Sequence, residues 1–178
     1  SAGIVFADMK PGNVLFVEDG SVKLSGFAVS QRISDLESAL ASHKPVPRRG
    51  SPFYMAPELF KDSGFHSFSS DIFGLGVVIH EMISGATPFS ACTSFQDLQR
   101  SVTSANPISV SELPCSPKLS HLLSRMLDKD PTTRIGWAEL AAHPWWGQGH
   151  GWKEAIANSN ISEIEARIHF LPKLTIRE

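Results

Sequence analysis

Near its start the chain carries the stretch Asp8-Met9-Lys10-Pro11-Gly12-Asn13. This stretch brings one carboxylate, one ammonium and one amide side chain together within six residues. Transfer of a phosphoryl group uses such a set: a carboxylate that accepts or orients a hydroxyl proton, a cation beside the moving phosphate, and an amide that can hold a metal ion. The same residues also describe an ordinary polar turn, so the surrounding sequence decides between the two interpretations.

The residues that follow predict a β-hairpin beside this stretch. Residues 14–16 and 21–24 are two short strand-like runs, and the strong turn signal Glu18-Asp19-Gly20 lies between them. Residues 28–50 are mixed and polar. We therefore expect a loop after the hairpin, with a short helix at 33–41.

The longest apolar-rich run predicts a helix in the middle of the domain. Residues 72–83 are apolar on nearly every face, and a helix that is apolar all round is normally buried. The cluster Ser69-Ser70-Asp71 predicts its N-cap, and Gly85 predicts its end. Gly74 and Gly76 lower the helix propensity of the run, which suggests close packing there. The run is too short and too polar to cross a bilayer.

Further helices are expected towards the end of the chain. Residues 117–128 carry one amphipathic stripe, formed by Leu119, Leu122, Leu123, Met126 and Leu127. We expect two more short helices, at 137–142 and at 161–169.

Composition excludes several classes of protein. The chain has 178 residues, of which 42% are hydrophobic and 19% charged, so general disorder is excluded. A formal net charge of −2 argues against binding to nucleic acid or to a membrane surface through basic patches. Cys92 and Cys115 form neither a disulfide pattern nor a metal pattern, which favours a reduced, cytoplasmic setting. Because the chain opens on an apolar run without an initiator methionine, we expect it to be a fragment.

Five further motifs follow the opening stretch in a fixed order. They are Gly26-Phe27-Ala28, residues 50–58 (Gly-Ser-Pro-Phe-Tyr-Met-Ala-Pro-Glu), residues 71–76 (Asp-Ile-Phe-Gly-Leu-Gly), Asp130-Pro131-Thr132-Thr133-Arg134 and His143-Pro144-Trp145-Trp146. In this order the motifs resemble the C-terminal lobe of a eukaryotic protein kinase over residues 1–146, with residues 147–178 as an extension. The resemblance implies a mainly α fold with a small β-hairpin beside the catalytic loop. It also implies an N-terminal lobe upstream, absent from this chain.

The resemblance implies a catalytic role for four residues. Asp8 would receive the proton of the substrate hydroxyl, and Lys10 would neutralise charge on the transferring phosphate of ATP. Asn13 would hold a metal ion, and Ser51 would bond to both Asp8 and Lys10. The presence of Lys10 in this position suggests serine/threonine rather than tyrosine specificity.

Three other residues would be structural. Glu58 and Arg134 match a buried ion pair that joins the activation segment to the lower lobe. Removing one partner of such a pair costs about 3–5 kcal/mol. Asp71 matches an aspartate that accepts backbone N–H groups of the catalytic loop, and its local interpretation as an N-cap agrees with that role.

The chain departs from the family pattern at two sites and in its extent. Phe6-Ala7 replaces the usual His-Arg, so control by a phosphorylated loop through that arginine is not expected. Gly26 replaces the aspartate that is the main magnesium ligand, and glycine brings no side-chain oxygen to a hard cation. Magnesium-dependent transfer should therefore be severely impaired. Because ATP binds between the two lobes in this family, the chain alone would hold half of a nucleotide site.

These observations favour a catalytically impaired pseudokinase that acts as an ATP-binding or scaffold module, with little or no magnesium dependence. The alternative is an active serine/threonine kinase with unusual metal use, and a third possibility is a truncated or mis-predicted gene product. The pattern of losses is similar to the Unc-51-like kinase 4 group, with Fused-type kinases as the nearest alternative. That group resemblance implies a cilium or microtubule association. The sequence itself names no protein substrate or scaffold partner.

Overall fold

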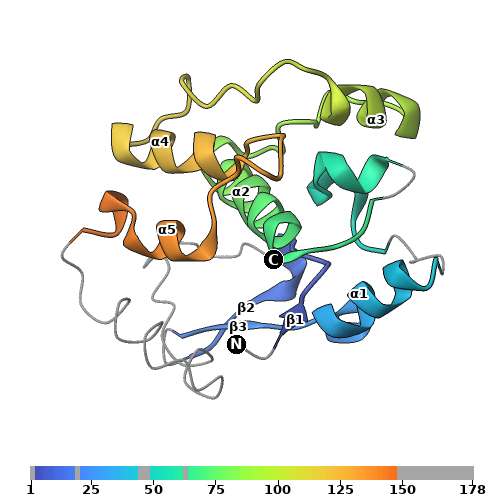
Figure 1. The fold of residues 1–178 in the computed structure, drawn as a ribbon. Helices are drawn as coiled ribbons and strands as arrows, with labels where there is room; N and C mark the ends of the chain where they lie inside the picture. Colours follow the sequence, from blue (N-terminus) through green and yellow to red (C-terminus); the bar gives the residue numbers. More distant parts are fainter. Residues whose placement is uncertain (1–2, 19–20, 44–48, 62–63, 148–178) are drawn as a thin grey trace.

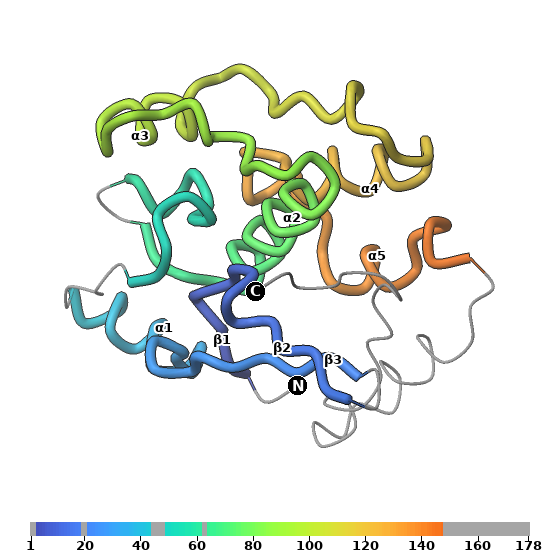
Figure 2. Tube along the Cα trace, turned by 180° about the vertical axis from the view of Figure 1, so that it is seen from behind, coloured from blue at the N-terminus to red at the C-terminus, as the bar shows by residue number. Residues whose placement is uncertain are grey.

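The 17-residue helix α2 (Phe68–Ser84) runs through the middle of the molecule. The computed structural model describes residues 3–18, 21–43, 49–61 and 64–147. Figures 1 and 2 show helices α3 (Phe95–Thr103) and α4 (Pro117–Met126) on one side of α2, and the strands and helix α1 (Ile33–Ala41) on the opposite side. The described part is mainly helical with two small antiparallel sheets, as the predicted fold class requires. The predicted helix at 161–169 and the extension beyond residue 147 lie outside the described residues.

Helix α2 begins two to four residues earlier than predicted. Its N-cap is Ser67, whose hydroxyl accepts the N–H of Ser70 while the Ser70 hydroxyl accepts the N–H of Ser67. The prediction of a cap at residues 69–71 was therefore wrong, because this reciprocal capping box places these residues inside the first turn. The predicted end is confirmed, since Gly85 follows the last helical residue with a φ of 79°.

The close packing expected at the helix glycines is confirmed. A Cβ atom at Gly76 would lie 3.0 Å from Leu127 Cδ2 and 3.1 Å from Met126 Cβ. A Cβ atom at Gly74 would lie 3.0 Å from Met9 Cβ. The first contact brings helix α4 (Pro117–Met126) against α2, and the second brings the loop that contains Asp8 against α2.

The main core surrounds these contacts. Its fully buried side chains come from α2, α3, α4 and the short 3-10 helix at Pro57–Phe60, and include Leu59, Phe73, Val77, Leu98, Leu122 and Leu123. Helix α5 (Trp137–Ala142) has the bounds predicted for it. Helix α4 ends two residues before the predicted limit, with Leu127 as its C-cap. Helix α3 (Phe95–Thr103) was not predicted, because only Leu98 and Val102 on it are buried.

The strands form two separate pairs. Strands β2 (Val14–Phe16) and β3 (Val22–Leu24) pair antiparallel, as the predicted hairpin requires, and the two turn residues 19–20 lie outside the described part. Strands β1 (Ile4–Val5) and β4 (Gln31–Arg32) also pair antiparallel. Helix α1 (Ile33–Ala41) follows β4 directly, with the bounds predicted for it. The β1–β4 pair thus joins the segment before Asp8 to the segment that leads into α1.

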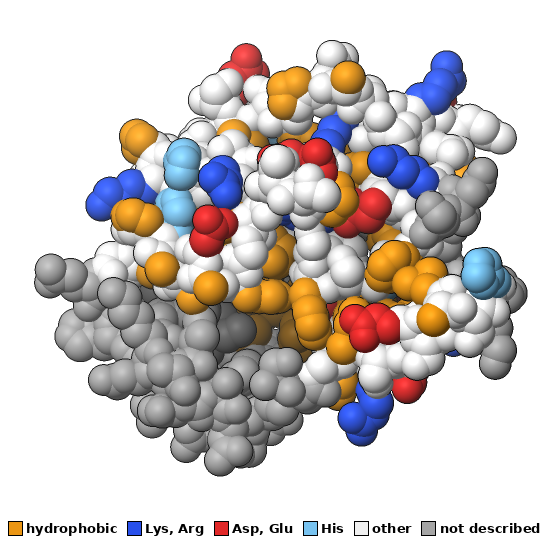
Figure 3. Space-filling model, in the orientation of Figure 1, with side chains coloured by type: hydrophobic (Ala, Val, Ile, Leu, Met, Phe, Trp, Pro, Cys, Tyr) orange, Lys and Arg blue, Asp and Glu red, His pale blue; other side chains and the backbone are white. Residues whose placement is uncertain are grey.

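Acidic and basic side chains are interspersed over the described residues of the face in Figure 3, so no basic stripe runs across that part of it. None of the helices among the described residues is long and apolar enough to span a bilayer.

Candidate active site

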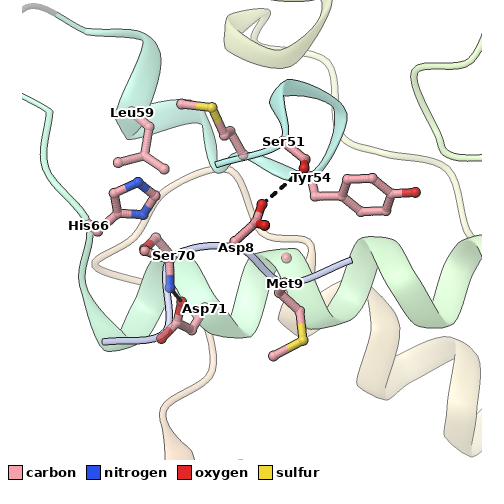
Figure 4. Close-up of a pocket in the computed structure, with 11 residues that line it drawn as sticks. Asp8, Met9, Ser51, Tyr54, Leu59, His66, Ser70 and Asp71 are labelled. Atoms are coloured by element: carbon pink, nitrogen blue, oxygen red, sulfur yellow. Dashed lines mark hydrogen bonds between the residues drawn. The ribbon is translucent and has the colours of Figure 1, made fainter. Parts of the chain in front are cut away.

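Four predicted site residues form one hydrogen-bonded network around the carboxylate of Asp8. Lys10 Nζ lies 2.9 Å from Asp8 Oδ2 and donates to Ser51 Oγ at 3.0 Å. The Ser51 hydroxyl donates to Asp8 Oδ1 at 2.9 Å, a contact drawn in Figure 4. Asn13 Nδ2 donates to Asp8 Oδ2 at 2.9 Å and to the Asp8 carbonyl at 2.8 Å. Both carboxylate oxygens of Asp8 therefore accept hydrogen bonds from within the chain.

Two short 3-10 helices place these side chains. One spans Pro11–Asn13, and its first residue is a proline, whose fixed φ suits the start of a helical turn. The Asn13 N–H donates to the Lys10 carbonyl across this turn, so the side chains of Lys10 and Asn13 both lie near Asp8. The other helix spans Pro52–Tyr54, and Ser51 precedes it.

Glycine is required at position 50, next to Ser51. Gly50 has a φ of 115°, and a Cβ atom there would lie 2.5 Å from the Ala7 carbonyl oxygen. A side chain at this position would push the two segments apart. The contact therefore brings Ser51 within reach of Asp8.

Asp71 holds the backbone that leads into Asp8. Its carboxylate accepts the N–H of Phe6 at 2.7 Å and the N–H of Ala7 at 2.9 Å. Burial raises the pKa of Asp71 to about 6, although both N–H donors act to lower it. The contact ties the first turn of α2 to the residues just before the network.

The electrostatic environment of Asp8 favours its charged form. Partial burial acts to raise the pKa of Asp8, but hydrogen bonds from Lys10, Ser51 and Asn13 together lower it below its usual 3.8. Asp8 is therefore a carboxylate at neutral pH. A carboxylate of this kind can accept a hydrogen bond from a substrate hydroxyl and orient it.

Glu58 and Arg134 form the buried ion pair that the resemblance implies. The guanidinium binds both carboxylate oxygens, at 2.8 and 2.9 Å, and its Nε donates to the Asp128 carbonyl at 2.7 Å. The Arg134 side chain is fully buried and stacks over the ring of Phe73, 5.0 Å from its centroid. Neither residue reaches the Asp8 network, so the pair is structural.

Four other side chains near the site, those of His66, Tyr54, Phe6 and Phe27, make contacts that were not predicted from the sequence. His66 is buried and lines the same pocket as Asp8 (Figure 4), and its Nε2 lies 2.7 Å from the Arg49 carbonyl oxygen. Tyr54 donates to Glu81 at 2.7 Å, which ties the segment after Ser51 to α2. The rings of Phe6 and Phe27 pack edge to face, with centroids 5.2 Å apart. These contacts join distant segments, so no local pattern signals them.

The residues present do not fit a magnesium site of the kind the family uses. Gly26 has no side-chain oxygen, and its φ of 80° is left-handed. A Cβ atom there would lie 2.5 Å from Asn13 Oδ1. The Asp8 oxygens already accept three hydrogen bonds, two of them on Oδ2 once Lys10 is counted. Within the described ranges no group of three or more His, Cys, Asp or Glu side chains could hold a metal ion.

Comparison with known proteins identifies a family. The sequence model described as "Protein kinase domain" matches residues 1–146. The chain is 40% identical over 146 residues to the serine/threonine-protein kinase RUNKEL of Arabidopsis thaliana, covering 82% of this chain and 10% of that protein. It is 37% identical over 144 residues to human serine/threonine-protein kinase ULK3, covering 78% of this chain and 28% of that protein.

A third relative is mouse serine/threonine-protein kinase ULK4, to which the chain is 31% identical over 191 aligned positions. The alignment covers 90% of this chain and 14% of that protein. The chain thus spans between 10% and 28% of the length of these relatives.

Proposed function

This chain belongs to the protein kinase family, and from that premise we propose that it forms the C-terminal lobe of a kinase domain that binds ATP without needing magnesium. In this proposal the domain serves as a scaffold for other proteins and transfers phosphate poorly. The observation that carries the proposal is the pairing of Gly26 with an Asp8 carboxylate whose two oxygens are already hydrogen-bonded within the chain.

The residues of the network have distinct parts in this function. Lys10, whose side chain is about one-third exposed, would lie against the outer phosphates of ATP and supply the positive charge that a metal ion otherwise provides. Ser51 and Asn13 would hold Asp8 in place. Asp8 would orient a hydroxyl group but would lack the metal-bound phosphate that efficient transfer needs.

Thermal unfolding of the full-length protein tests the proposal. A ligand that binds only the folded state stabilises it by RT ln(1 + [L]/Kd), about 2.7 kcal/mol at 100 times Kd. We expect ATP to raise Tm equally in EDTA and in magnesium. Lys10→Met should reduce the rise, whereas Lys23→Met, which removes an exposed lysine on β3, should not. A rise that appears only with magnesium would refute the proposal.

The alternative function is serine/threonine phosphorylation with unusual metal use. It is supported by the charged Asp8 and its bonds to Lys10 and Ser51. An assay of transfer to protein substrates with magnesium, manganese and calcium in turn decides between the two. Transfer that disappears in Asp8→Asn would favour the enzyme.

We also propose a cytoplasmic location with a cilium or microtubule association. The cytoplasmic location is supported by Cys92 and Cys115, which form no disulfide pattern. The cilium or microtubule association is supported only by the similarity of the motif losses to the Unc-51-like kinase 4 group. Imaging of the tagged full-length protein tests it, and diffuse staining without any filament or cilium signal would contradict it.

A further inference from the structure

We propose that Leu36, on helix α1, is a positioning residue for the candidate site. In this proposal Leu36 holds Ala7 in its unusual backbone conformation, and Ala7 in turn sets the position of Asp8. No sequence motif connects Leu36 with Asp8, because they are 28 positions apart.

Leu36 belongs to a small apolar cluster that is separate from the main core. The cluster contains Val5, Ala7 and Leu36, which are exposed by 0%, 7% and 2%. The half-buried side chains of Val29, Ile33 and Phe68 pack around it. Leu36 is the only buried residue of α1, so it is the side chain of this helix that enters the cluster.

The chain before α1 is tied to the same segment by polar contacts. Val5 pairs with Gln31 in the β1–β4 ladder. The Ser30 hydroxyl donates to the Phe6 carbonyl at 2.8 Å, and the Ile33 N–H donates to the Gly3 carbonyl at 2.7 Å. These bonds hold α1 directly beside residues 3–7.

Ala7 needs such support because its backbone is in the left-handed region. Its φ is 69°, a value that residues with a Cβ atom rarely adopt. Three neighbours surround it: Asp71 accepts its N–H, Gly50 packs against its carbonyl oxygen, and the Leu36 cluster encloses its methyl group. If the cluster loosens, Ala7 can relax to an ordinary conformation and Asp8, the next residue, moves with it.

The contacts that hold α1 in place are apolar side chains and hydrogen bonds within the chain, and none of them needs a phosphate group. The segment that carries α1 would then be ordered whether or not it is phosphorylated. This inference rests on the proposed function only in taking Asp8 and its neighbours as the site that faces the nucleotide.

Hydrogen exchange measured by mass spectrometry on the full-length protein, without nucleotide, tests the inference. We expect Leu36→Ala to accelerate exchange at least tenfold in peptides covering residues 3–8 and 33–41. Peptides from α2 and α4 should change much less. Leu36→Met, which keeps the apolar volume, should restore slow exchange, and Glu37→Ala, on the exposed face of α1, should have no effect. Phosphatase treatment of the wild type should leave both peptides unchanged.

Two results would overturn the inference. Equal acceleration in all peptides would mean that Leu36 only contributes to global stability. Acceleration confined to 33–41 would mean that α1 moves without disturbing Ala7. If Leu36→Ala does not fold, the milder Leu36→Val gives the same comparison. Because no ATP is present, failure of the proposed ATP binding would leave these results unaffected.

Discussion

Two features of Gly26 oppose the binding of a magnesium ion beside Asn13. Glycine has no side-chain oxygen, and its left-handed backbone leaves no room for a side chain. Gly26 is left-handed, and the space beside it is taken by the Asn13 amide, which two hydrogen bonds to Asp8 hold in place. Restoring a carboxylate by Gly26→Asp therefore requires both a backbone change and displacement of Asn13. We expect that this single replacement does not create a magnesium-dependent response to ATP.

A double-mutant cycle measures the interaction between positions 26 and 13. Gly26→Ala should lower the free energy of unfolding by about 1–2 kcal/mol from backbone strain alone, and further because its Cβ meets Asn13. In the Asn13→Ala background the cost should be smaller, with a coupling of at least about 0.5 kcal/mol. Urea denaturation checks both values. Gly12→Ala, where a Cβ meets nothing within 4 Å, is the control, and strictly additive effects would contradict the prediction.

At the scale of elements, local signals predicted most of the helices and missed the contacts between segments. The apolar residues of the stripe on α4 lie within a few positions of one another, and so do the residues of the turn signal in the β2–β3 hairpin. Each of these elements is therefore predicted from its local sequence. The β1–β4 pair and α3 have weak local signals, since β4 has two residues and α3 buries only two side chains. Among the four residues Ser67 to Ser70, three could cap α2, and only the reciprocal bond between Ser67 and Ser70 decides the start.

The contact between α4 and the turn after α5 predicts a pH dependence of stability. His143 Nδ1 accepts the N–H of Trp145, so the neutral ring carries its proton on Nε2, 2.9 Å from His121 Nδ1. Burial, together with the nearby charges of His121 and Arg125, lowers the pKa of His143. The Arg125–Glu139 pair also faces this turn.

The direction of the effect follows from the lowered pKa. The folded protein binds this proton less tightly than the unfolded chain does. The stability that neutral His143 contributes is therefore fully present above about pH 6.5, the pKa of an unperturbed histidine. It is lost as the pH falls through the lower pKa that His143 has in the folded state. Tm measured from pH 7.5 to pH 5 should fall less in His143→Asn, which can still cap Trp145. Burial also lowers the pKa of His66 and raises that of Asp71 to about 6, and these two shifts contribute to the remaining slope with opposite signs. Identical slopes would contradict the prediction.

For the whole molecule, the order of motifs was enough to predict which distant residues meet. Asp8 and Ser51 are 43 positions apart, and Glu58 and Arg134 are 76 apart, yet both pairs are hydrogen-bonded. Spacing alone contains no information on such distances in space, so this part came from the resemblance. The resemblance did not indicate which contacts form where the family's usual residues are absent, as at Phe6-Ala7. The Leu36 cluster and the packing of Phe6 on Phe27 depend on how side chains fill the space, which only the structure describes.

The ion pair of Glu58 and Arg134 gives the prediction that belongs to this scale, because it joins three segments of the chain: the 3-10 helix at Pro57–Phe60, helix α2 and the turn at residues 128–134. Arg134 binds Glu58, the Ser69 carbonyl and the Asp128 carbonyl, and lies over Phe73. Arg134→Ala leaves the Glu58 carboxylate, 14% exposed, without this partner, and should lower the free energy of unfolding by about 3–5 kcal/mol.

Urea denaturation compares this loss with that of Arg100→Ala. Arg100 pairs with Asp97 at an exposed site on α3, where the arginine side chain is 78% exposed, and its removal should cost no more than about 1 kcal/mol. Arg134→Lys should fall between the two, because lysine keeps the charge but cannot bind both carboxylate oxygens and the Asp128 carbonyl together. Equal losses in Arg134→Ala and Arg100→Ala would show that burial of the pair adds nothing, and that the three segments are held together by the apolar core alone.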